Sequence, residues 1–309
     1  MRVSILSART GWHTDQLCRA LANRGHTASI VSYQGLTARI GDRSCGLASD
    51  GDTLLEADAV LARIIPDGSL EQVIFRVDAL HWLEDHGVPV MNAPRAIERS
   101  VDKFYTTALL HEAGLATPPT VVCESADDAM RAVREFRDVV IKPIFGSMGH
   151  GLVRVADPDT AFRVVKSLER IRSVFYVQRA IDHGGRDVRV FVVGERVVAA
   201  IERFAVNGDW RTNVARGAAV RSFDLPADWA RIAARAAAVV GADYAGVDLL
   251  PARDGSLYVL EVNGIPGWQG LQQATGIDVA GVIVEQLESV HSRVAGARSR
   301  DAQPVDVGA

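Results

Sequence analysis

The sequence predicts a mixed α/β (or α+β) protein of two or three domains, and three observations predict it. The chain has 309 residues, a length that is usually divided among two or three domains, and 48% of its residues are hydrophobic, enough to form buried cores. Residues 1–93 alternate short apolar strands with helical stretches, a βαβ pattern that is typical of a parallel sheet. Residues 174–263 are rich in strand signals separated by glycine-containing turns.

Four strands and two helices are expected within residues 1–93. The strands are Val3–Leu6, Thr27–Val31, Ala57–Ile64 and Val88–Met91. One helix, which Thr14 caps, ends near Gly25, and a second covers residues 70–86. No GxGxxG turn follows the first strand, so a dinucleotide site is not expected.

After residue 93 the pattern changes to helices paired with strands. Helices are expected at Ala96–Ala113, Ala126–Phe136, Pro226–Val240 and Val279–Val290, and strands at Thr120–Cys123, Val139–Lys142 and Gly151–Val155. Apolar periodicity is lost after His291, so we expect residues 292–309 to form a disordered tail. The expected domains are therefore residues 1–93, 94–180 and 181–291.

Composition and charge exclude several classes of protein. The net charge of -4 gives no electrostatic basis for binding nucleic acid. No apolar run approaches the roughly 18–20 residues that span a bilayer, and Met1–Leu6 becomes polar too soon for a signal peptide. Cys18, Cys45 and Cys123 lack a CxxC pattern, which favours a reducing compartment over disulfides or a zinc site. We expect a cytoplasmic protein whose partner is a small molecule or a peptide.

Two strands that carry acidic residues are joined by Asp254-Gly255, a strong signal for a two-residue hairpin turn. Counting back from that turn places Asp248 opposite Glu261, with Asn263 on the same face. Opposed carboxylates repel by roughly 0.2–1 kcal/mol, so a cation between them is expected. Carboxylate and amide oxygens suit Mg²⁺. The alternative, an exposed polar face, is disfavoured because the flanking residues are strongly apolar.

A buried-type strand, Val139–Lys142, ends in a lysine and leads into a glycine-rich loop. Three glycines, Gly146, Gly149 and Gly151, leave backbone N–H groups free to cover phosphate oxygens. A plain turn is the alternative, because no GK[ST] completes a Walker A sequence. Lys103 lies early in a helix, where it is also typical of a solvated surface lysine.

A second hairpin turns at Gly194-Glu195, which fits a type II′ turn. Alternation along this strand places Asp187 and Arg189 on one face, near Glu202. Further arginines follow within a short span: Arg203, Arg211 and Arg216. Arginines here suit a transferring phosphoryl group or a carboxylate held by two hydrogen bonds, although singly they are ordinary surface charges.

Together these segments resemble the ATP-grasp superfamily, and within it the RimK-type α-L-glutamate ligases. The resemblance covers about residues 1–290 and implies an ATP-grasp fold with an N-terminal βαβ pre-ATP-grasp domain. It rests on Asp102-Lys103, Ile141–Pro143 with Gly146–Gly151, Gly185–Val192, Trp210–Gly217, Ala245–Leu250 and Glu261–Trp268. Residues 94–180 are then the central subdomain with the glycine-rich loop, and residues 181–291 the C-terminal subdomain with the metal site.

The resemblance implies a role for each candidate residue. ATP would be bound by Lys103, Lys142, Gly146, Ser147, Gly149 and Gly151, by the adenine-holding segment Gln178, Arg179, Ala180 and Ile181, and by Asp187, Arg211 and Asn213. Mg²⁺ or Mn²⁺ would be bound by Asp248, Glu261 and Asn263. Catalytic contacts would come from Arg189, Arg203 and Arg211. Substrate contacts would come from Arg63, Arg203 and Arg216.

The implied reaction has two steps: a carboxylate attacks the γ-phosphate of ATP to give an acyl phosphate and ADP, and an amine then displaces phosphate. Gly208–Asn213 and Pro266–Gln272 resemble the branch tied to tetrahydromethanopterin-type C1 carriers. We therefore expect a small-molecule carboxylate acceptor and L-glutamate as the amine. The alternatives are a protein C-terminus, an amino-group carrier protein, and a regulator that binds ATP without catalysis. We expect a homo-oligomer (dimer or tetramer) that contacts neither nucleic acid nor membrane.

Overall fold

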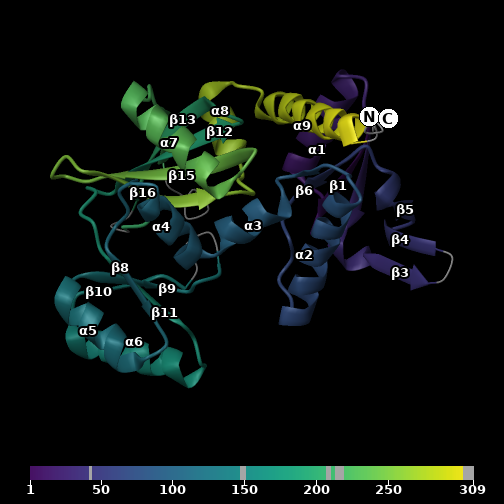
Figure 1. Ribbon diagram of the computed structural model, residues 1–309. Coiled ribbons are helices and arrows are strands. Elements are labelled where there is room, and N and C mark those ends of the chain that lie inside the picture. Colours follow the sequence, from purple (N-terminus) through teal and green to yellow (C-terminus); the bar gives the residue numbers. More distant parts are fainter. Residues whose placement is uncertain (42–43, 147–150, 207–209, 213–218, 302–309) are drawn as a thin grey trace, which may run out of the picture.

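The computed structural model describes residues 1–41, 44–146, 151–206, 210–212 and 219–301. Its strands form four sheets, and the helices pack against three of them. Figure 1 shows the N-terminal elements on the right, the central elements α5, α6 and β8–β11 at the lower left, and β12–β16 with α7 at the upper left. Within the described residues no helix combines the length and the apolarity that a membrane crossing requires. The predicted mixture of helices and strands is confirmed.

The N-terminal sheet is parallel, as predicted, with the strand order β2-β1-β6-β7. Its strands are β1 (Arg2–Ser7), β2 (Thr27–Ser32), β6 (Ala59–Ala62) and β7 (Val90–Met91), and its helices are α1 (Trp12–Asn23) and α2 (Leu70–Asp85). Helix α1 begins two residues before the predicted cap Thr14, whose hydroxyl instead bonds back to the N–H and C=O of Gly11. Ser69 caps α2 by accepting from the N–H of Gln72.

A small antiparallel sheet between β2 and β6 was not predicted. It consists of β3 (Thr37–Gly41), β4 (Ser44–Ser49) and β5 (Asp52–Thr53), with 3₁₀ turns η1 (Tyr33–Gly35) and η2 (Leu54–Glu56) on either side. All five residues of β3 are exposed, so no alternation of apolar and polar residues announces the strand.

The predicted single helix Ala96–Ala113 is wrong, because two helices occupy this segment: α3 (Pro94–Val101) and α4 (Lys103–Glu112). The break falls at Asp102, which ends α3 and caps α4 by accepting a hydrogen bond from the N–H of Tyr105 at 3.0 Å. Lys103 is therefore the first residue of α4, where its side chain turns toward the central sheet.

The central sheet is antiparallel with the order β10-β9-β11-β8. Its strands are β8 (Thr120–Cys123), β9 (Val139–Lys142), β10 (Val153–Val155) and β11 (Phe175–Arg179), and α5 (Ala126–Phe136) and α6 (Pro158–Arg170) cover one face. The opposite face carries Lys142 and Gln178, which hydrogen-bond to each other across neighbouring strands.

The C-terminal sheet is antiparallel with the order β14-β13-β12-β15-β16. Its strands are β12 (Arg186–Val193), β13 (Arg196–Phe204), β14 (Ala219–Ser222), β15 (Tyr244–Pro251) and β16 (Leu257–Asn263), accompanied by α7 (Ala227–Val240) and α8 (Gln269–Thr275). Apolar residues of α7 pack on one face of the sheet. The other face carries the polar side chains of the site.

Both predicted hairpins form, and each contains a β-bulge. The loop between β15 and β16 has three residues rather than two, since Ala252 bonds to Ser256, yet a bulge at Leu260 restores the predicted pairing of Asp248 with Glu261. In the β12–β13 hairpin the turn Gly194-Glu195 is as predicted, but a bulge after Phe191 shifts the register by one residue. The predicted proximity of Asp187 and Glu202 is therefore wrong, because Arg203 lies opposite Asp187.

The expected disordered tail is wrong for residues 292–301, which continue the last helix, α9 (Val279–Asp301). The His291 ring bonds to the carbonyl of Asp58 at 2.9 Å, and Arg293 pairs with Asp243 at 3.3 Å. These polar contacts tie α9 to its neighbours where apolar periodicity has ended. Earlier in α9, apolar side chains share a core with β1, α1 and the C-terminal sheet, which joins the two ends of the chain.

Candidate functional site

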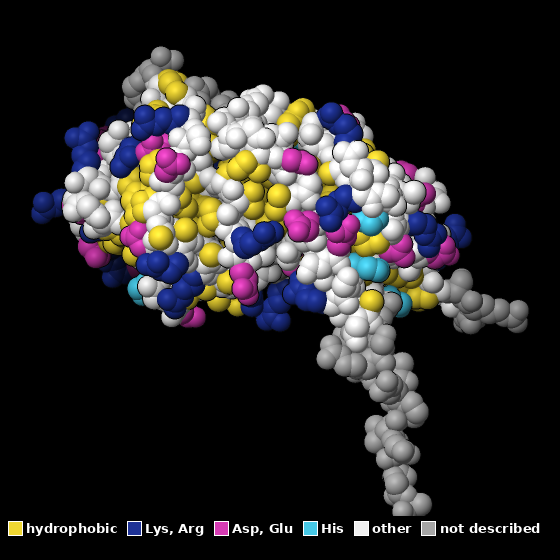
Figure 2. Space-filling model, turned by 90° about the horizontal axis from the view of Figure 1, so that it is seen from above, with side chains coloured by type: hydrophobic (Ala, Val, Ile, Leu, Met, Phe, Trp, Pro, Cys, Tyr) yellow, Lys and Arg dark blue, Asp and Glu magenta, His cyan; other side chains and the backbone are white. Residues whose placement is uncertain are grey.

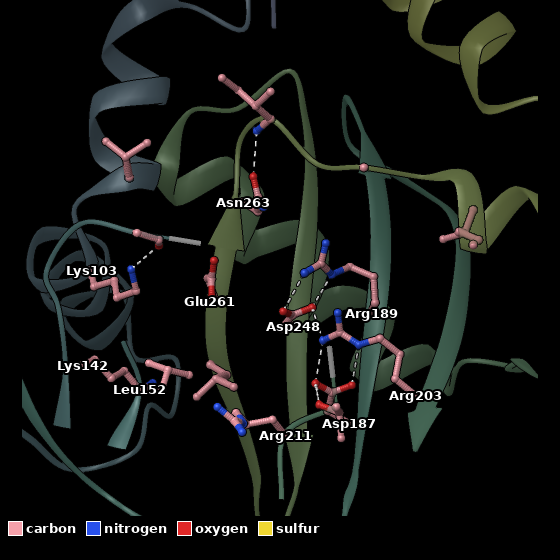
Figure 3. A pocket seen from close by; sticks show the side chains of 18 of the residues that line it. Lys103, Lys142, Leu152, Asp187, Arg189, Arg203, Arg211, Asp248, Glu261 and Asn263 are labelled. Atoms are coloured by element: carbon pink, nitrogen blue, oxygen red, sulfur yellow. Dashed lines mark hydrogen bonds and ion pairs between the residues drawn. The ribbon is translucent and has the colours of Figure 1, made fainter. Parts of the chain in front are cut away.

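A cavity of about 970 Å³ is lined by residues of the N-terminal, central and C-terminal sheets and the loops beside them. Most of the predicted site residues meet there: Arg63, Lys103, Lys142, Gly146, Gln178, Arg179, Ala180, Ile181, Asp187, Arg189, Arg203, Arg211, Asp248, Glu261 and Asn263. In Figure 3, Lys103 and Lys142 lie on one side of Glu261, while Arg189 and Arg203 lie on the other side beside Asp248. Asn213 and Arg216 lie outside the described residues.

Positive charge dominates the walls of this cavity. Nine Lys or Arg side chains and three carboxylates line it among the described residues. Two of the carboxylates, Asp187 and Asp248, are already paired with arginines. The cavity is therefore suited to ligands that carry several negative charges.

The two lysines lie without acidic partners at hydrogen-bond distance in the described part of the chain. The Nζ of Lys103 donates to the carbonyl oxygens of Ile144, at 3.2 Å, and Gly146, at 2.6 Å. The Nζ of Lys142 donates to Oε1 of Gln178 at 2.6 Å and lies 5.8 Å from the ring centre of Tyr176. Burial lowers the pKa of Lys142 to about 8; the charge of Glu261 opposes this shift and that of Lys103 adds to it. Burial also lowers the pKa of Lys103. An anion between the lysines would relieve this cost.

The glycine-rich loop leaves the central sheet beside these lysines. Gly146 and Gly151 adopt φ angles of 132° and 72°, which L side chains rarely adopt. A Cβ on Gly151 would lie 3.3 Å from Cγ of Pro143, so Gly151 lies close against that proline. Ser147 and Gly149 lie outside the described residues.

The segment from Gln178 to Ile181, at the end of β11 in the central sheet, also lines the cavity. Not all of its backbone groups are available to a ligand, since the N–H groups of Arg179 and Ala180 donate to Pro119 and Asp138. The N–H of Ile181 has no acceptor among the described residues. It is therefore available to donate a hydrogen bond to a ligand in the cavity. The side chain of Gln178 has a separate task, because it holds Lys142.

Asp187 is held in a buried network with Arg203 and Thr212. Arg203 donates two hydrogen bonds to Asp187, at 2.7 and 2.6 Å, and the Thr212 hydroxyl donates a third at 2.5 Å. The side chains of Asp187 and Arg203 are only 3% and 6% exposed. Burial, with the charge of Asp248 adding to it, nevertheless raises the pKa of Asp187, although Arg203 and Thr212 act to lower it. Asp187 therefore has its acceptor oxygens largely committed to the protein.

Asp248 is bound by two arginines. Arg189 donates to both carboxylate oxygens, through Nη2 at 2.8 Å and through Nε, and Arg203 lies 3.0 Å away. Burial alone would raise the pKa of Asp248, but the charges of Arg189 and Arg203 hold it below its usual range. Gly246 makes this possible, since a Cβ there would lie 2.8 Å from Arg189 Nη1. The cations facing Asp248 in this structure are guanidinium groups.

Glu261 and Asn263 are the more accessible part of the predicted metal site. The Glu261 carboxylate has no hydrogen-bond partner among the described residues, although both cavity lysines act on it electrostatically. Asn263 Oδ1 accepts from the N–H of Ile265 at 2.9 Å and retains a second lone pair. No group of three or more His, Cys, Asp or Glu side chains suited to a metal occurs in the described part of the chain. A half-buried, unpartnered carboxylate beside an amide oxygen fits a hard cation.

Sequence reasoning missed the apolar walls of the cavity. They are formed by Val140, Leu152, Leu250 and Leu260, among others. Leu260 lines the cavity beside Glu261 because the bulge interrupts the alternation of the strand. Nothing in the composition of β16 marks that bulge. Arg9, in the loop after β1, and His13, in the first turn of α1, were also missed, although their position after a parallel strand was a usable signal.

Residues 100–287 match the family described as RimK-like ATP-grasp domain, and residues 1–97 match the RimK PreATP-grasp domain. The chain is 34% identical to the tetrahydromethanopterin:alpha-L-glutamate ligase of Methanosarcina acetivorans, over 90% of this chain and 96% of that protein. It is 33% identical to a probable alpha-L-glutamate ligase of Trichodesmium erythraeum, over 93% of this chain and 96% of that protein.

Solved structures share the fold. A RimK domain ATP-grasp protein from Sphaerobacter thermophilus is similar with a TM-score of 0.70 and 24% identity, over 93% of this chain and all of that one. The ATP-grasp ligase PsnB, complexed with minimal precursor, Mg and ADP, is similar with a TM-score of 0.72 and 21% identity, over 94% and 98% of the two chains.

The Arg203 network leads to a prediction about stability. In Arg203→Met, two buried carboxylates lose a shared cation, so the free energy of unfolding should fall by about 3–5 kcal/mol near pH 7.5. Without Arg203 the folded pKa of Asp187, already raised by burial, rises further above its unfolded value. Stability is then lost as pH rises between those two values, so the deficit should be smaller at pH 5. Urea unfolding at the two pH values measures it.

Arg196→Met is the matched control, because Arg196 pairs with Glu285 at 3.8 Å on the exposed end of the same hairpin strand. This variant should change the stability little at either pH. A deficit for Arg203→Met that is equally small, or that grows on acidification, would contradict the network.

Proposed function

The chain belongs to the RimK-like ATP-grasp ligase family, and on that premise we propose that it adds L-glutamate to a carboxylate of a small cofactor, of the tetrahydromethanopterin-type C1 carriers. The reaction would consume ATP and release ADP and phosphate. The observation that carries the ligase chemistry is the pair of lysines, Lys103 and Lys142, that face the unpartnered Glu261 across one cavity. The choice of acceptor is supported by the relatives that bear this name.

We propose that the nucleotide occupies the part of the cavity next to the central sheet. The apolar side chains of Val140, Leu152 and Leu260 would contact the two faces of the adenine, and the N–H of Ile181 would donate to its edge. The phosphates would then extend toward Lys103 and Lys142, with Arg211 on the far side. In Figure 3, Arg211 lies between the lysines and Asp187, which supports this arrangement.

Mg²⁺ would be held by Glu261 and Asn263, which are hard oxygen ligands next to the phosphate-binding lysines. Asp248 could join them through Oδ2, which accepts one hydrogen bond, from Arg189, and retains a lone pair. When bound, the ion would neutralise charge on the phosphate oxygens. Ser147 and Gly149, with Gly146 and Gly151, are proposed to cover the phosphates and exclude water that would hydrolyse an acyl phosphate.

The chain itself would act mainly by position and charge. In the first step a substrate carboxylate displaces ADP from the γ-phosphate, and in the second the amine of L-glutamate displaces phosphate from the acyl phosphate. Arg189 and Arg203 line the cavity beside Asp248 (Figure 3), and the Nη1 group of each has no carboxylate partner among the described residues. We propose that these remaining donors stabilise the phosphoryl group in transit. Arg216 remains a proposed substrate contact.

A small acceptor is also favoured by the charge of the surface. The net charge is -4, and Figure 2 shows Lys and Arg interspersed with Asp and Glu on the face seen from above. That face therefore offers no continuous basic area for docking a larger acidic partner. The strong positive charge lies inside the cavity, where it faces a bound ligand rather than the outer surface.

The decisive experiment mixes the protein with ATP, Mg²⁺, L-glutamate and a C1-carrier extract. We expect ADP as the spent nucleotide by chromatography, and a gain of one or more glutamyl units on the carrier by mass spectrometry. AMP as the main product would rule out the acyl-phosphate route. Extension of only a protein C-terminus, or preferential use of another amino acid, would disprove the acceptor or the amine while leaving the ligase.

The metal proposal predicts that Glu261→Gln removes most ADP-forming activity. The glutamine amide fills the same space as the carboxylate but carries no negative charge for the metal. The Mg²⁺ concentration for half-maximal activity should therefore rise about tenfold or more. The Tm should stay within a few degrees of the parent. Glu195→Gln, in the exposed β12–β13 turn, is the control and should behave as the parent does. Unchanged Mg²⁺ dependence in Glu261→Gln would exclude this carboxylate as a ligand.

Binding of ADP should be coupled to proton uptake at Lys142. Its pKa is about 8 in the free protein, so most of the side chain is neutral at pH 8.5. A phosphate beside it favours the ammonium form and raises that pKa, so ADP binding takes up a proton at pH 8.5 but not at pH 6.5. Calorimetry in buffers of different ionisation enthalpy measures the uptake. Lys142→Arg, always charged, should bind ADP without it. Equal uptake in both proteins would remove Lys142 from the phosphate site.

A further inference from the structure

The cavity has a second end, at the carboxyl edge of the N-terminal sheet. It is lined there by Ser7, the last residue of β1, by residues 9–14 after β1, and by residues 63–65 after β6. From β1 the chain passes to β2 on one side of it and later to β6 on its other side. The direction of strand order therefore reverses between β1 and β6, which is the topological switch point of the sheet. Ligands of open parallel sheets bind in this crevice. Backbone bonds from Arg63 to Leu6 and from Ala8 to Ile64 hold the two loops side by side.

Arg63 is a buried cation at this edge. It is 3% exposed, and its guanidinium donates to the Tyr244 hydroxyl at 2.9 Å and to the carbonyl of Pro266 at 3.2 Å. The ring of Trp268 lies 4.8 Å from its central carbon. These partners are all neutral, and the described residues give it no carboxylate. A guanidinium has five N–H donors, so both a countercharge and donors remain to be satisfied.

The first turn of α1 points backbone donors at the same place. Gly11 precedes the helix and has no side chain to cap it, while the Thr14 hydroxyl is engaged with Gly11 itself. The N–H groups of Trp12 and His13 have no acceptor within the described structure. The positive end of the twelve-residue helix therefore faces the cavity with donors to spare.

His13 adds a neutral donor. Its Nε2 accepts a hydrogen bond from the N–H of Trp268 at 3.1 Å, which assigns the proton of the neutral ring to Nδ1. Burial, and then the charges of Arg63 and Arg9, lower the pKa of His13 to about 4. The ring is therefore neutral at pH 7. Part of the fall in the pKa of His13 comes from the positive charges of Arg63 and Arg9 nearby.

We propose that Arg63, Arg9, His13 and the first N–H groups of α1 form an anion subsite, separate from the phosphate lysines, that binds a substrate carboxylate which does not react. The proposal rests on the proposed function, whose two substrates carry more carboxylates than the one that is phosphorylated. An arginine fork with adjacent N–H donors matches the two oxygens of a carboxylate. That carboxylate belongs to L-glutamate or to the acceptor, and the experiment distinguishes them.

Binding can be measured without turnover. The full-length protein, saturated with ADP and Mg²⁺ so that the phosphate lysines are occupied, is titrated calorimetrically with L-glutamate and with glutarate, a dicarboxylate without an amine. In Arg63→Met the Kd of at least one probe should rise about tenfold or more, the loss of a charge-assisted hydrogen bond. The affinity for ADP should not change.

Two further variants separate binding from structure. Arg63 also holds the Pro266 loop, so Arg63→Met can lose stability, whereas Arg9 is exposed and Arg9→Gln should keep the Tm of the parent. Arg9→Gln should still raise the Kd about threefold, the weaker effect of a more solvated charge. Arg19→Gln, which removes an exposed arginine of α1 outside the cavity, is the matched control and should bind as the parent does.

The turnover assay assigns the carboxylate. A raised KM for L-glutamate in Arg9→Gln places the incoming amino acid in the subsite, and a raised KM for the carrier places the acceptor there. The subsite is disproved if neither probe binds the parent protein, or if Arg63→Met and Arg9→Gln bind both probes as Arg19→Gln does. An absence of glutamate-dependent ADP release would disprove the proposed function instead, and the glutarate titration would still decide the subsite.

Discussion

The site depends on one buried side chain, Asn92, which joins the N-terminal sheet to the C-terminal sheet. Its Nδ2 donates to the carbonyls of Tyr244, at 2.8 Å, and Gly264, and its Oδ1 accepts from the N–H of Tyr244 at 3.0 Å. Asn92 directly follows β7 of the N-terminal sheet. Its two partners belong to the C-terminal sheet: Tyr244 is the first residue of β15, and Gly264 directly follows β16. A Cβ on Gly264 would come within 2.7 Å of Ser100, which keeps this junction tight. Because this junction holds the two sheets together, the acidic strands and the loops after β1 and β6 form walls of one cavity.

Within the cavity that this junction forms, the ion pairs determine which charged side chains bind each other and which remain able to bind ligands. Asp187 and Asp248 neutralise Arg203 and Arg189 inside the sheet, so these four groups mostly satisfy one another. Among the other cations of the cavity, the two lysines lie beside the central sheet and Arg63 lies beside the N-terminal sheet. Burying such charges without partners costs free energy that a bound anion returns as affinity. The same imbalance thus supports both the nucleotide proposal and the carboxylate subsite.

The two hairpins show how far the sequence predicts this site. Asp248 faces Glu261 as predicted, but only because a bulge at Leu260 compensates for a loop one residue longer than Asp254-Gly255 suggested. In the other hairpin the turn was predicted correctly, and the bulge after Phe191 made Arg203 rather than Glu202 the partner of Asp187. Local turn signals specify where a hairpin bends, whereas bulges respond to packing against other strands. The break at Asp102 escaped prediction for a related reason, since an aspartate within a helical pattern is tolerated and becomes a cap only when the chain must turn there.

The bulge at Leu260 also explains how one strand serves two kinds of ligand surface. In a regular strand, consecutive side chains point to opposite faces, so a leucine next to a glutamate would be buried against α7. The extra residue instead leaves Val259 and Val262 packed in the α7 core while both Leu260 and Glu261 line the cavity. An apolar wall for a ring and a carboxylate for a cation thereby become immediate neighbours on one rigid element. Nucleotides require this pairing of an apolar base with a charged tail, and a strand supplies it with less freedom than a loop would.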